Sequence, residues 1–171
     1  MFTAQLDGMG PFAIRYPRGK GVIADWHNEM QELPVGRGRR LHEGENVAVL
    51  SIGHIGNEVI DVVNRLDERG IKVGHYDMIY LKPIDEEILK EVTAHYHSLI
   101  TIEDGTVVGG LGSAVAEWLA SHDKSNRLMM LGVQDEFVHQ GTVAELYERC
   151  GMDAQSLENT IMEMMDQQDN N

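Results

Sequence analysis

The stretch VAVLSIGHIGNEVIDVVNRLDERG, residues 47–70, decides the fold class. Its first six residues are almost all apolar, which is typical of a strand covered on both faces. The residues after Gly53-His54 place four apolar side chains at helical spacing: Val59, Ile60, Val63 and Leu66. Gly70 is a typical residue for the end of such a helix. The stretch therefore predicts a buried strand followed by an amphipathic helix, which is the first part of a βαβ unit.

The same alternation continues toward the C-terminus. We expect further strands at residues 71–78, 99–102 and 127–133, and helices beginning near residues 83, 111, 143 and 156. An earlier strand at residues 37–41, joined by a tight turn at residues 43–45, is expected to be an antiparallel neighbour. The predicted fold class is α/β: a three-layer, mostly parallel, twisted sheet of about five strands, with one antiparallel edge strand and helices on both faces.

The first 40 residues differ from the rest of the chain. They carry six basic and four acidic residues, whereas residues 41–171 carry eight basic and 24 acidic residues. They are rich in glycine and proline, and their one short apolar run, residues 12–14, predicts a strand without an obvious partner. Such a segment is typical of a linker or of the end of a neighbouring domain.

Composition excludes several classes of function. The chain has 171 residues, a formal net charge of −14 and a single cysteine, Cys150. Nucleic acid and anionic membranes would repel this average surface, so neither is expected as a partner. No apolar run approaches the roughly 20 residues that span a bilayer. One cysteine cannot form an internal disulfide, which fits a cytoplasmic protein.

A glycine-rich turn at residues 109–113, GGLGS, follows a predicted strand and precedes a helix. A dinucleotide-binding fingerprint would need glycine or alanine where Val115 stands. Glu103 and Asp104, which lie beside the turn, would oppose an anion. We therefore expect a tight turn between strand and helix, or close backbone packing against another domain, rather than a cofactor site.

Histidine and cysteine residues give no site. None of the eight histidines has zinc-ligand spacing, so solvated or core positions are expected. His139 lies in a loop where a functional role is more plausible, and Cys150 lacks an identifiable base. From these residues we predict no catalytic, cofactor-binding or metal-binding residue.

The strongest chemical signal is the segment IRYPRG, residues 14–19. Arg15 and Arg18 flank a bend fixed by Pro17, an arrangement that suits a clamp for a phosphate or a carboxylate. The same arginines would equally suit a linker that pairs with an acidic surface. The residues themselves do not separate these two interpretations.

These residues resemble a known family. Residues 10–19, GPFAIRYPRG, resemble the end of the pyrimidine-binding domain in the 1-deoxy-D-xylulose-5-phosphate synthase family, and the remainder resembles the C-terminal domain of the transketolase superfamily. The other motifs that carry the resemblance are LPVGRG (33–38), LKPID (81–85), IED (102–104), GGLGSAV (109–115), HQGT (139–142) and GMDA (151–154). One departure is Ile79-Tyr80, where the family commonly has Arg-Phe.

The resemblance implies a specific activity for a longer parent protein. That family uses thiamine diphosphate and Mg²⁺ to convert pyruvate and glyceraldehyde 3-phosphate into 1-deoxy-D-xylulose 5-phosphate and CO₂. It implies that Arg18 contacts the phosphate of the acceptor and that Arg15 is structural. The family's Gly-Asp-Gly motif for metal and diphosphate does not occur in this sequence. By this resemblance the chain is an inactive C-terminal fragment that binds no cofactor.

The resemblance also implies an organisation. Residues 1–35 would be the end of the pyrimidine-binding domain plus a linker, residues 36–166 the C-terminal domain, and residues 167–171 a polar tail. Its partners would be the remaining domains of the parent and a second copy in a homodimer. Two alternatives remain: the corresponding domain of a transketolase or of a 2-oxo-acid dehydrogenase β-subunit, and a stand-alone anion-binding module. The Ile79-Tyr80 departure leaves a paralogue with altered function open.

Overall fold

The computed structural model describes residues 1–17, 27 and 29–166. The chain divides into two units, Met1–Val35 and Gly36–Asn171. The described part of the first unit contains a short 3-10 helix, Thr3–Gln5, and the hydroxyl of Thr3 accepts a hydrogen bond from the backbone N–H of Leu33 at 2.9 Å. The strand expected at residues 12–14 is not formed. That expectation was wrong: the strands that the structure describes all belong to the second unit, and a strand needs a neighbour to complete its hydrogen bonds.

The second unit is built on a five-stranded sheet of order β1-β3-β2-β4-β5. The strands are β1 (Arg39–His42), β2 (Val47–Ile52), β3 (Gly74–Asp77), β4 (Ser98–Thr106) and β5 (Arg127–Val133). All neighbouring strands are parallel except β1 and β3, which are antiparallel. The first four residues of β2 are fully buried, as their apolar run predicts for a central strand.

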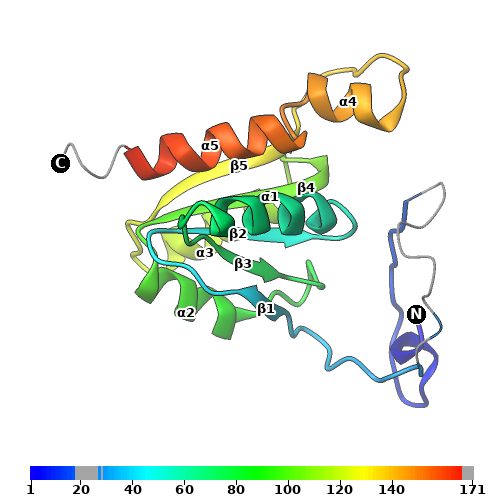
Figure 1. The fold of residues 1–171 in the computed structure, drawn as a ribbon. Coiled ribbons are helices and arrows are strands. Elements are labelled where there is room, and N and C mark those ends of the chain that lie inside the picture. The colour runs from blue at the N-terminus through cyan, green and yellow to red at the C-terminus, as the bar shows by residue number, and fades with distance from the viewer. Residues whose placement is uncertain (18–26, 28, 167–171) are drawn as a thin grey trace. The chain divides into compact units, whose positions relative to one another are not determined.

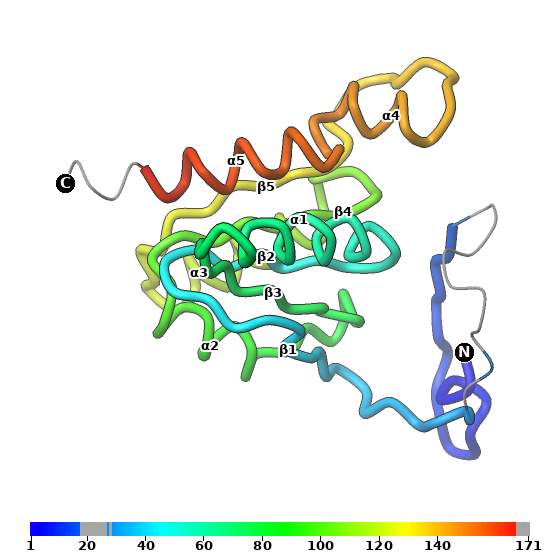
Figure 2. Tube along the Cα trace, in the orientation of Figure 1, coloured from blue at the N-terminus to red at the C-terminus, as the bar shows by residue number. Residues whose placement is uncertain are grey.

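Helices cover both faces of this sheet (Figures 1 and 2). They are α1 (Gly56–Glu68), α2 (Glu86–His95), α3 (Leu111–Ser121), α4 (Val143–Arg149) and α5 (Ala154–Asp166). One apolar core joins α1 and α5 to one face of the sheet, and a second core joins α2 and α3 to the other face. The expected three-layer α/β fold with one antiparallel edge strand is therefore confirmed.

Local chemistry explains several element boundaries. Gly70, with φ +79°, follows α1 in a conformation that favours glycine. Asp85 caps α2 by accepting hydrogen bonds from the backbone N–H groups of Glu87 and Ile88. Thr142 and Glu145 form a reciprocal capping box at the start of α4.

A tight turn at residues 43–45 was expected to join the first strand to an antiparallel neighbour, but the structure gives this strand a different partner. β1 pairs with β3 rather than with β2, which follows it in sequence. The connection from β1 to β2 therefore crosses the start of β3, where Glu45 donates a backbone hydrogen bond to the carbonyl of Lys72 at 3.2 Å. Gly44 lies at this crossing. Only glycine fits there, because a Cβ would come within 2.0 Å of the backbone nitrogen of Gly74.

Among the described residues, no helix is both long enough and apolar enough to cross a membrane.

Candidate functional site

Arg18, the residue predicted to contact an acceptor phosphate, lies outside the described residues. The five residues immediately before it, residues 13–17, are exposed, and Tyr16 is 71% exposed. The structure consequently leaves the role of Arg18 as a prediction.

Two of the family motifs, residues 36–38 and 82–85, lie against each other in the second unit. Gly36 has φ +73°, and a Cβ at this position would come within 2.7 Å of the Cγ atom of Pro83. The Lys82–Pro83 peptide bond is cis. Gly38 has no space for a side chain either, because a Cβ would lie 2.6 Å from the carbonyl oxygen of Asp77. The two motifs therefore form one packed unit.

Asp85 is the centre of this contact. Its carboxylate accepts hydrogen bonds from the backbone N–H groups of Gly38 at 2.8 Å, Glu87 at 3.0 Å and Ile88 at 3.2 Å, and from Nη1 of Arg37 at 3.2 Å. Burial by itself raises the pKa of Asp85, but these backbone hydrogen bonds and the charge of Arg37 bring its pKa below the usual value. One buried carboxylate thus fastens the start of the second unit to α2.

The strand order changes direction at β2, which lies between β3 and β4. In open α/β sheets, ligands bind beyond the carboxyl ends of the strands at such a switch point. The residues that follow β2 and end β4 are therefore the first place to look for a site. They include His54 on one side and Glu103 and Asp104 on the other.

Glu103 fills the space above the glycine-rich turn at residues 109–113. Its Oε1 accepts a hydrogen bond from the backbone N–H of Gly112 at 3.0 Å, near the start of α3. A Cβ at Gly110 would come within 2.0 Å of Oε2 of Glu103. Glycine is needed at this position because a carboxylate of the same chain occupies the helix N-terminus. The expected tight turn between a strand and a helix is present, between β4 and α3.

His54 connects the other side of the switch point to α4. Its Nε2 lies 2.6 Å from the hydroxyl of Tyr147, and its Nδ1 lies 3.6 Å from a carboxylate oxygen of Asp104. Tyr147 is the one buried residue of α4. These side chains link the residues after β2 and the end of β4 to α4.

The glycine-rich turn does not fit thiamine diphosphate, the cofactor that the resemblance implies for the parent protein. A diphosphate at the N-terminus of α3 would meet the carboxylate of Glu103, which already accepts the available N–H of Gly112. Within the part of the chain that the structure describes, no group of three or more histidine, cysteine, aspartate or glutamate side chains could hold a metal ion.

A buried polar pair lies between the central strands. The hydroxyl of Ser51 on β2 lies 2.8 Å from Nε2 of His75 on β3, and both residues are at most 1% exposed. Burial, followed by the nearby charges of His42 and Arg39, lowers the pKa of His75 to about 4. His75 is therefore neutral in the folded protein at physiological pH.

This pair predicts a loss of stability in mild acid. His75 titrates near 6.5 when unfolded and near 4 when folded, so between these values the unfolded chain binds a proton that the folded chain does not. Its contribution is complete above about pH 6.5 and falls by about 3 kcal/mol as the pH approaches 4. Urea denaturation from pH 7.5 to 4.5 measures it. We expect His75→Gln to flatten the profile, and the exposed control His95→Gln to keep the slope. Equal slopes in both variants would contradict the assignment.

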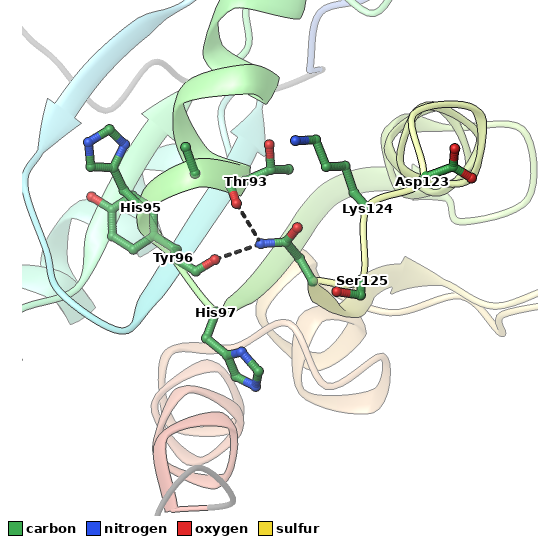
Figure 3. A pocket seen from close by; sticks show the side chains of 9 residues that line it. Thr93, His95, Tyr96, His97, Asp123, Lys124 and Ser125 are labelled. Carbon is green, nitrogen blue, oxygen red and sulfur yellow. Dashed lines mark hydrogen bonds between the residues drawn. The ribbon is translucent and has the colours of Figure 1, made fainter.

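A polar hollow of about 360 Å³ lies near the amino ends of β4 and β5 (Figure 3). It is lined by Thr93, Ala94, His95, Tyr96, His97, Asp123, Lys124, Ser125 and Asn126. The side-chain amide of Asn126 donates to the carbonyls of Thr93 at 3.1 Å and Tyr96 at 2.6 Å, so it satisfies the C-terminal end of α2. The hollow is open and its central amide is committed to the backbone, which favours a structural role.

The remaining sequence candidates are dispersed. His139 is exposed in the loop before α4, and Cys150 is half-buried at the end of that helix. His122 stacks on Trp118 with a ring separation of 4.1 Å. Sequence reasoning did not identify the roles of Asp85 or of Ser51 with His75. The available signals were an aspartate directly before the acidic start of a helix, and polar residues inside apolar strands.

The mostly parallel five-stranded sheet, with the packed motifs at residues 36–38 and 82–85, defines the class of the second unit as a three-layer α/β domain. Residues 36–157 match the family model described as "Transketolase, C-terminal domain". This chain belongs to the transketolase C-terminal domain family.

Relatives that the chain resembles over nearly its whole length include 1-deoxy-D-xylulose-5-phosphate synthases. The chain is 50% identical over 157 residues to the synthase of Parabacteroides distasonis, covering 92% of this chain and 25% of that protein. It is 50% identical over 165 residues to the synthase of Porphyromonas gingivalis, covering 96% of this chain and 26% of that protein. The chain therefore spans about a quarter of the length of these relatives.

Solved structures support the same fold. A split-gene transketolase described as an inactive beta4 tetramer matches with a TM-score of 0.70 and 32% identity, over 80% of this chain and 43% of that one. Transketolase from Campylobacter jejuni matches with a TM-score of 0.51 and 18% identity, over 75% of this chain and 18% of that one. The second similarity concerns the fold alone.

Proposed function

We propose that this chain is the C-terminal part of a 1-deoxy-D-xylulose-5-phosphate synthase. The observation that carries the proposal is 50% identity over 92% of the chain to a synthase. The parent reaction would join pyruvate and glyceraldehyde 3-phosphate to give 1-deoxy-D-xylulose 5-phosphate and CO₂. This activity would serve isoprenoid precursor synthesis in the cytoplasm.

Thiamine diphosphate and Mg²⁺ would be bound by other parts of the parent. The occupied turn at Glu103 supports this division, because the second unit has its own carboxylate where a diphosphate would bind. The isolated chain would accordingly be inactive, without catalytic, cofactor-binding or metal-binding residues. Its substrate contact would be the phosphate of glyceraldehyde 3-phosphate at Arg18.

The second unit would act in assembly. Residues 1–35 would be the end of the pyrimidine-binding domain with its linker, residues 36–166 the C-terminal domain, and residues 167–171 a polar tail. The bonds of Asp85 to Arg37 and Gly38 would fix the exit of the linker. The domain would brace its neighbours in the parent and contribute to a homodimer.

A transketolase is the second candidate. The 32% identity and TM-score of 0.70 to a split-gene transketolase favour it. The higher identity to the synthases, together with the Tyr16-Pro17-Arg18-Gly19 segment, favours the first proposal. A chimera separates the two.

The chimera replaces the last quarter of the Parabacteroides distasonis synthase with this chain. We expect it to retain turnover of pyruvate with glyceraldehyde 3-phosphate. The matched control carries instead the C-terminal domain of Campylobacter jejuni transketolase and is expected to be much less active. A folded but inactive chimera would contradict the proposal.

Titration calorimetry on the chain alone is expected to give no saturable binding of thiamine diphosphate with Mg²⁺, and micromolar binding would refute the fragment assignment.

Arg18→Ala in the active chimera is expected to impair the use of glyceraldehyde 3-phosphate. Loss of one charge-assisted contact costs about 1.5–3 kcal/mol, which corresponds to about tenfold or more in kcat/KM for this substrate. Arg18→Lys keeps the charge and is expected to recover part of the loss. Steady-state kinetics with each substrate varied in turn measure the effect. Unchanged acceptor kinetics would remove Arg18 from the site.

A further inference from the structure

Residues 134–150, here called the α4 arm, connect β5 to the turn before α5. The loop of the arm is exposed except at the half-buried Val138, and five of the seven residues of α4 are exposed. Phe137 is 100% exposed. The arm also carries the family motif HQGT, residues 139–142, which is exposed throughout. The packing of the second unit therefore does not account for this motif.

Tyr147 fastens the arm to the rest of the second unit. It is 9% exposed and packs in the apolar core that joins α1 and α5 to the sheet. Its hydroxyl lies 2.6 Å from Nε2 of His54, in the loop after β2. Nδ1 of His54 lies 3.6 Å from a carboxylate oxygen of Asp104. This carboxylate favours a proton on Nδ1, so that Nε2 accepts a hydrogen bond from the Tyr147 hydroxyl.

The two ends of the arm allow α4 to move as one body. The N-cap lies within the arm, because Thr142 and Glu145 cap the helix reciprocally. At the other end, Gly151 has φ +67° and no atom within 4 Å of an added Cβ. Met152, the next residue, is 1% exposed in the core and anchors the chain again. The exposed loop and Gly151 can therefore absorb the backbone rotations of a hinge without loss of the helix cap.

We propose that the α4 arm opens as one local unit, with the Tyr147–His54 hydrogen bond as its latch and Gly151 as its hinge. Segments with few buried apolar contacts open at a lower free energy than the core. Opening removes Tyr147 from His54 and Asp104 at the carboxyl ends of β2 and β4, where open α/β sheets bind ligands. The latch thus links access to this switch point to the position of the HQGT motif. The inference does not depend on which reaction the parent protein catalyses.

Hydrogen exchange followed by mass spectrometry tests the opening on the full 171-residue chain. The amides of Leu146 and Cys150 donate to the carbonyls of Thr142 and Leu146, so they report on α4. We expect α4 to exchange at least about tenfold faster than β2. Its rate is expected to be insensitive to low urea concentrations, because local opening exposes little surface. Exchange of α4 only together with β2, by global unfolding, would overturn the inference.

Tyr147→Phe removes the latch and keeps the ring. We expect α4 to exchange about fivefold faster, as for the loss of one hydrogen bond. The matched control is Tyr76→Phe, which removes a 2.8 Å hydroxyl bond to Glu91 in the other core. That bond stays intact when the arm opens, so the control is expected to leave α4 exchange unchanged. Equal acceleration of α4 in both variants would show that α4 opens only by global unfolding.

His54→Ala removes the same latch from the other side, and it serves where Tyr147→Phe does not fold. Its α4 exchange is expected to be at least as fast as in Tyr147→Phe. The double variant is expected to be no faster than His54→Ala alone, because the hydroxyl has then already lost its acceptor. Additive effects of the two substitutions would show that these side chains do not form one latch.

The thiol of Cys150 provides an independent measurement. Cys150 is half-buried at the end of α4 and packs against the core that contains Tyr147. It is the one cysteine of the chain, so a thiol reagent such as dithionitrobenzoate labels this position alone. We expect labelling to be about fivefold faster in Tyr147→Phe and unchanged in Tyr76→Phe. Equal labelling rates in folded Tyr147→Phe and the unsubstituted chain would contradict the latch.

Discussion

Asp85→Ala is expected to lower the free energy of unfolding of the second unit by about 3–4 kcal/mol. The substitution removes the N-cap of α2, which typically costs about 1–2 kcal/mol. It also leaves the part-buried N–H of Gly38 without an acceptor, which costs about 1–3 kcal/mol more. The hydrogen bond and ion pair from Arg37 are lost as well. Urea denaturation followed by circular dichroism measures the change.

A matched helix cap provides the control for Asp85. Asp153 caps α5 by accepting hydrogen bonds from the backbone N–H groups of Gln155 and Ser156 and from the hydroxyl of Ser156, so these bonds all lie within three residues of it. Asp153→Ala is therefore expected to cost only about 1 kcal/mol. Asp85→Asn keeps an acceptor oxygen and is expected to lie between the two. If both alanine variants lose the same stability, the bond to Gly38 contributes nothing.

Gly44→Ala is expected to destabilise the second unit by about 3 kcal/mol or more, because overpacking against backbone is not relieved by a rotamer change. The added Cβ would lie 2.0 Å from the backbone nitrogen of Gly74 and 2.3 Å from the carbonyl carbon of Val73. The turn would have to lift from β3, which would also break the 3.2 Å hydrogen bond from Gly44 to the hydroxyl of Tyr96. Thermal and urea denaturation measure the loss.

Gly70→Ala separates steric contact from backbone conformation. Gly70 has φ +79° but no atom within 4 Å of an added Cβ, so its substitution is expected to cost only about 1 kcal/mol. Gly44, in contrast, is constrained by contact alone. Equal losses in the two variants would show that the crossing over β3 is looser than the structure has it.

The fold was largely predictable because its central elements carry strong local patterns. The apolar run at residues 47–52 forms β2 over the same residues. Helix and strand order, the layers and the antiparallel edge also follow from periodicity and from turn residues. Boundaries shifted by a few residues: the strand expected at residues 71–78 forms only over Gly74–Asp77. Its first residues connect the strand to α1 instead.

The pairing of β1 was less predictable, because it depends on contacts between distant segments. A short turn at residues 43–45 favours a hairpin with the next strand, yet β3 inserts between β1 and β2. The deciding contact, Gly44 against Gly74, joins residues 30 positions apart. The local sequence does not show whether Gly44 is needed for a bend of the chain or for close contact with another backbone segment.

In the candidate site, too, contacts between residues close in sequence were predictable, whereas contacts between distant segments were not. The carboxylate of Glu103 beside the glycine-rich turn could be anticipated from sequence, because both lie within ten residues of each other. The network of Asp85 joins residues 47 and 48 positions apart, and the Ser51–His75 pair joins neighbouring strands. Their sequence signals are single polar residues, which acquire a role only through tertiary contacts.

Glu103 affects whether small anions can bind to this domain. Its carboxylate belongs to the same chain, accepts the hydrogen bond of the Gly112 N–H, and so competes with any free anion for that group. Tethering of this kind corresponds to an effective concentration on the order of millimolar or higher. A phosphorylated metabolite would have to exceed that concentration, or bind much more tightly, to take the place of the carboxylate. Glu103 therefore keeps small anions from the N-terminus of α3. Replacing Glu103 with a small neutral residue would leave the N–H of Gly112 free to bind an anion.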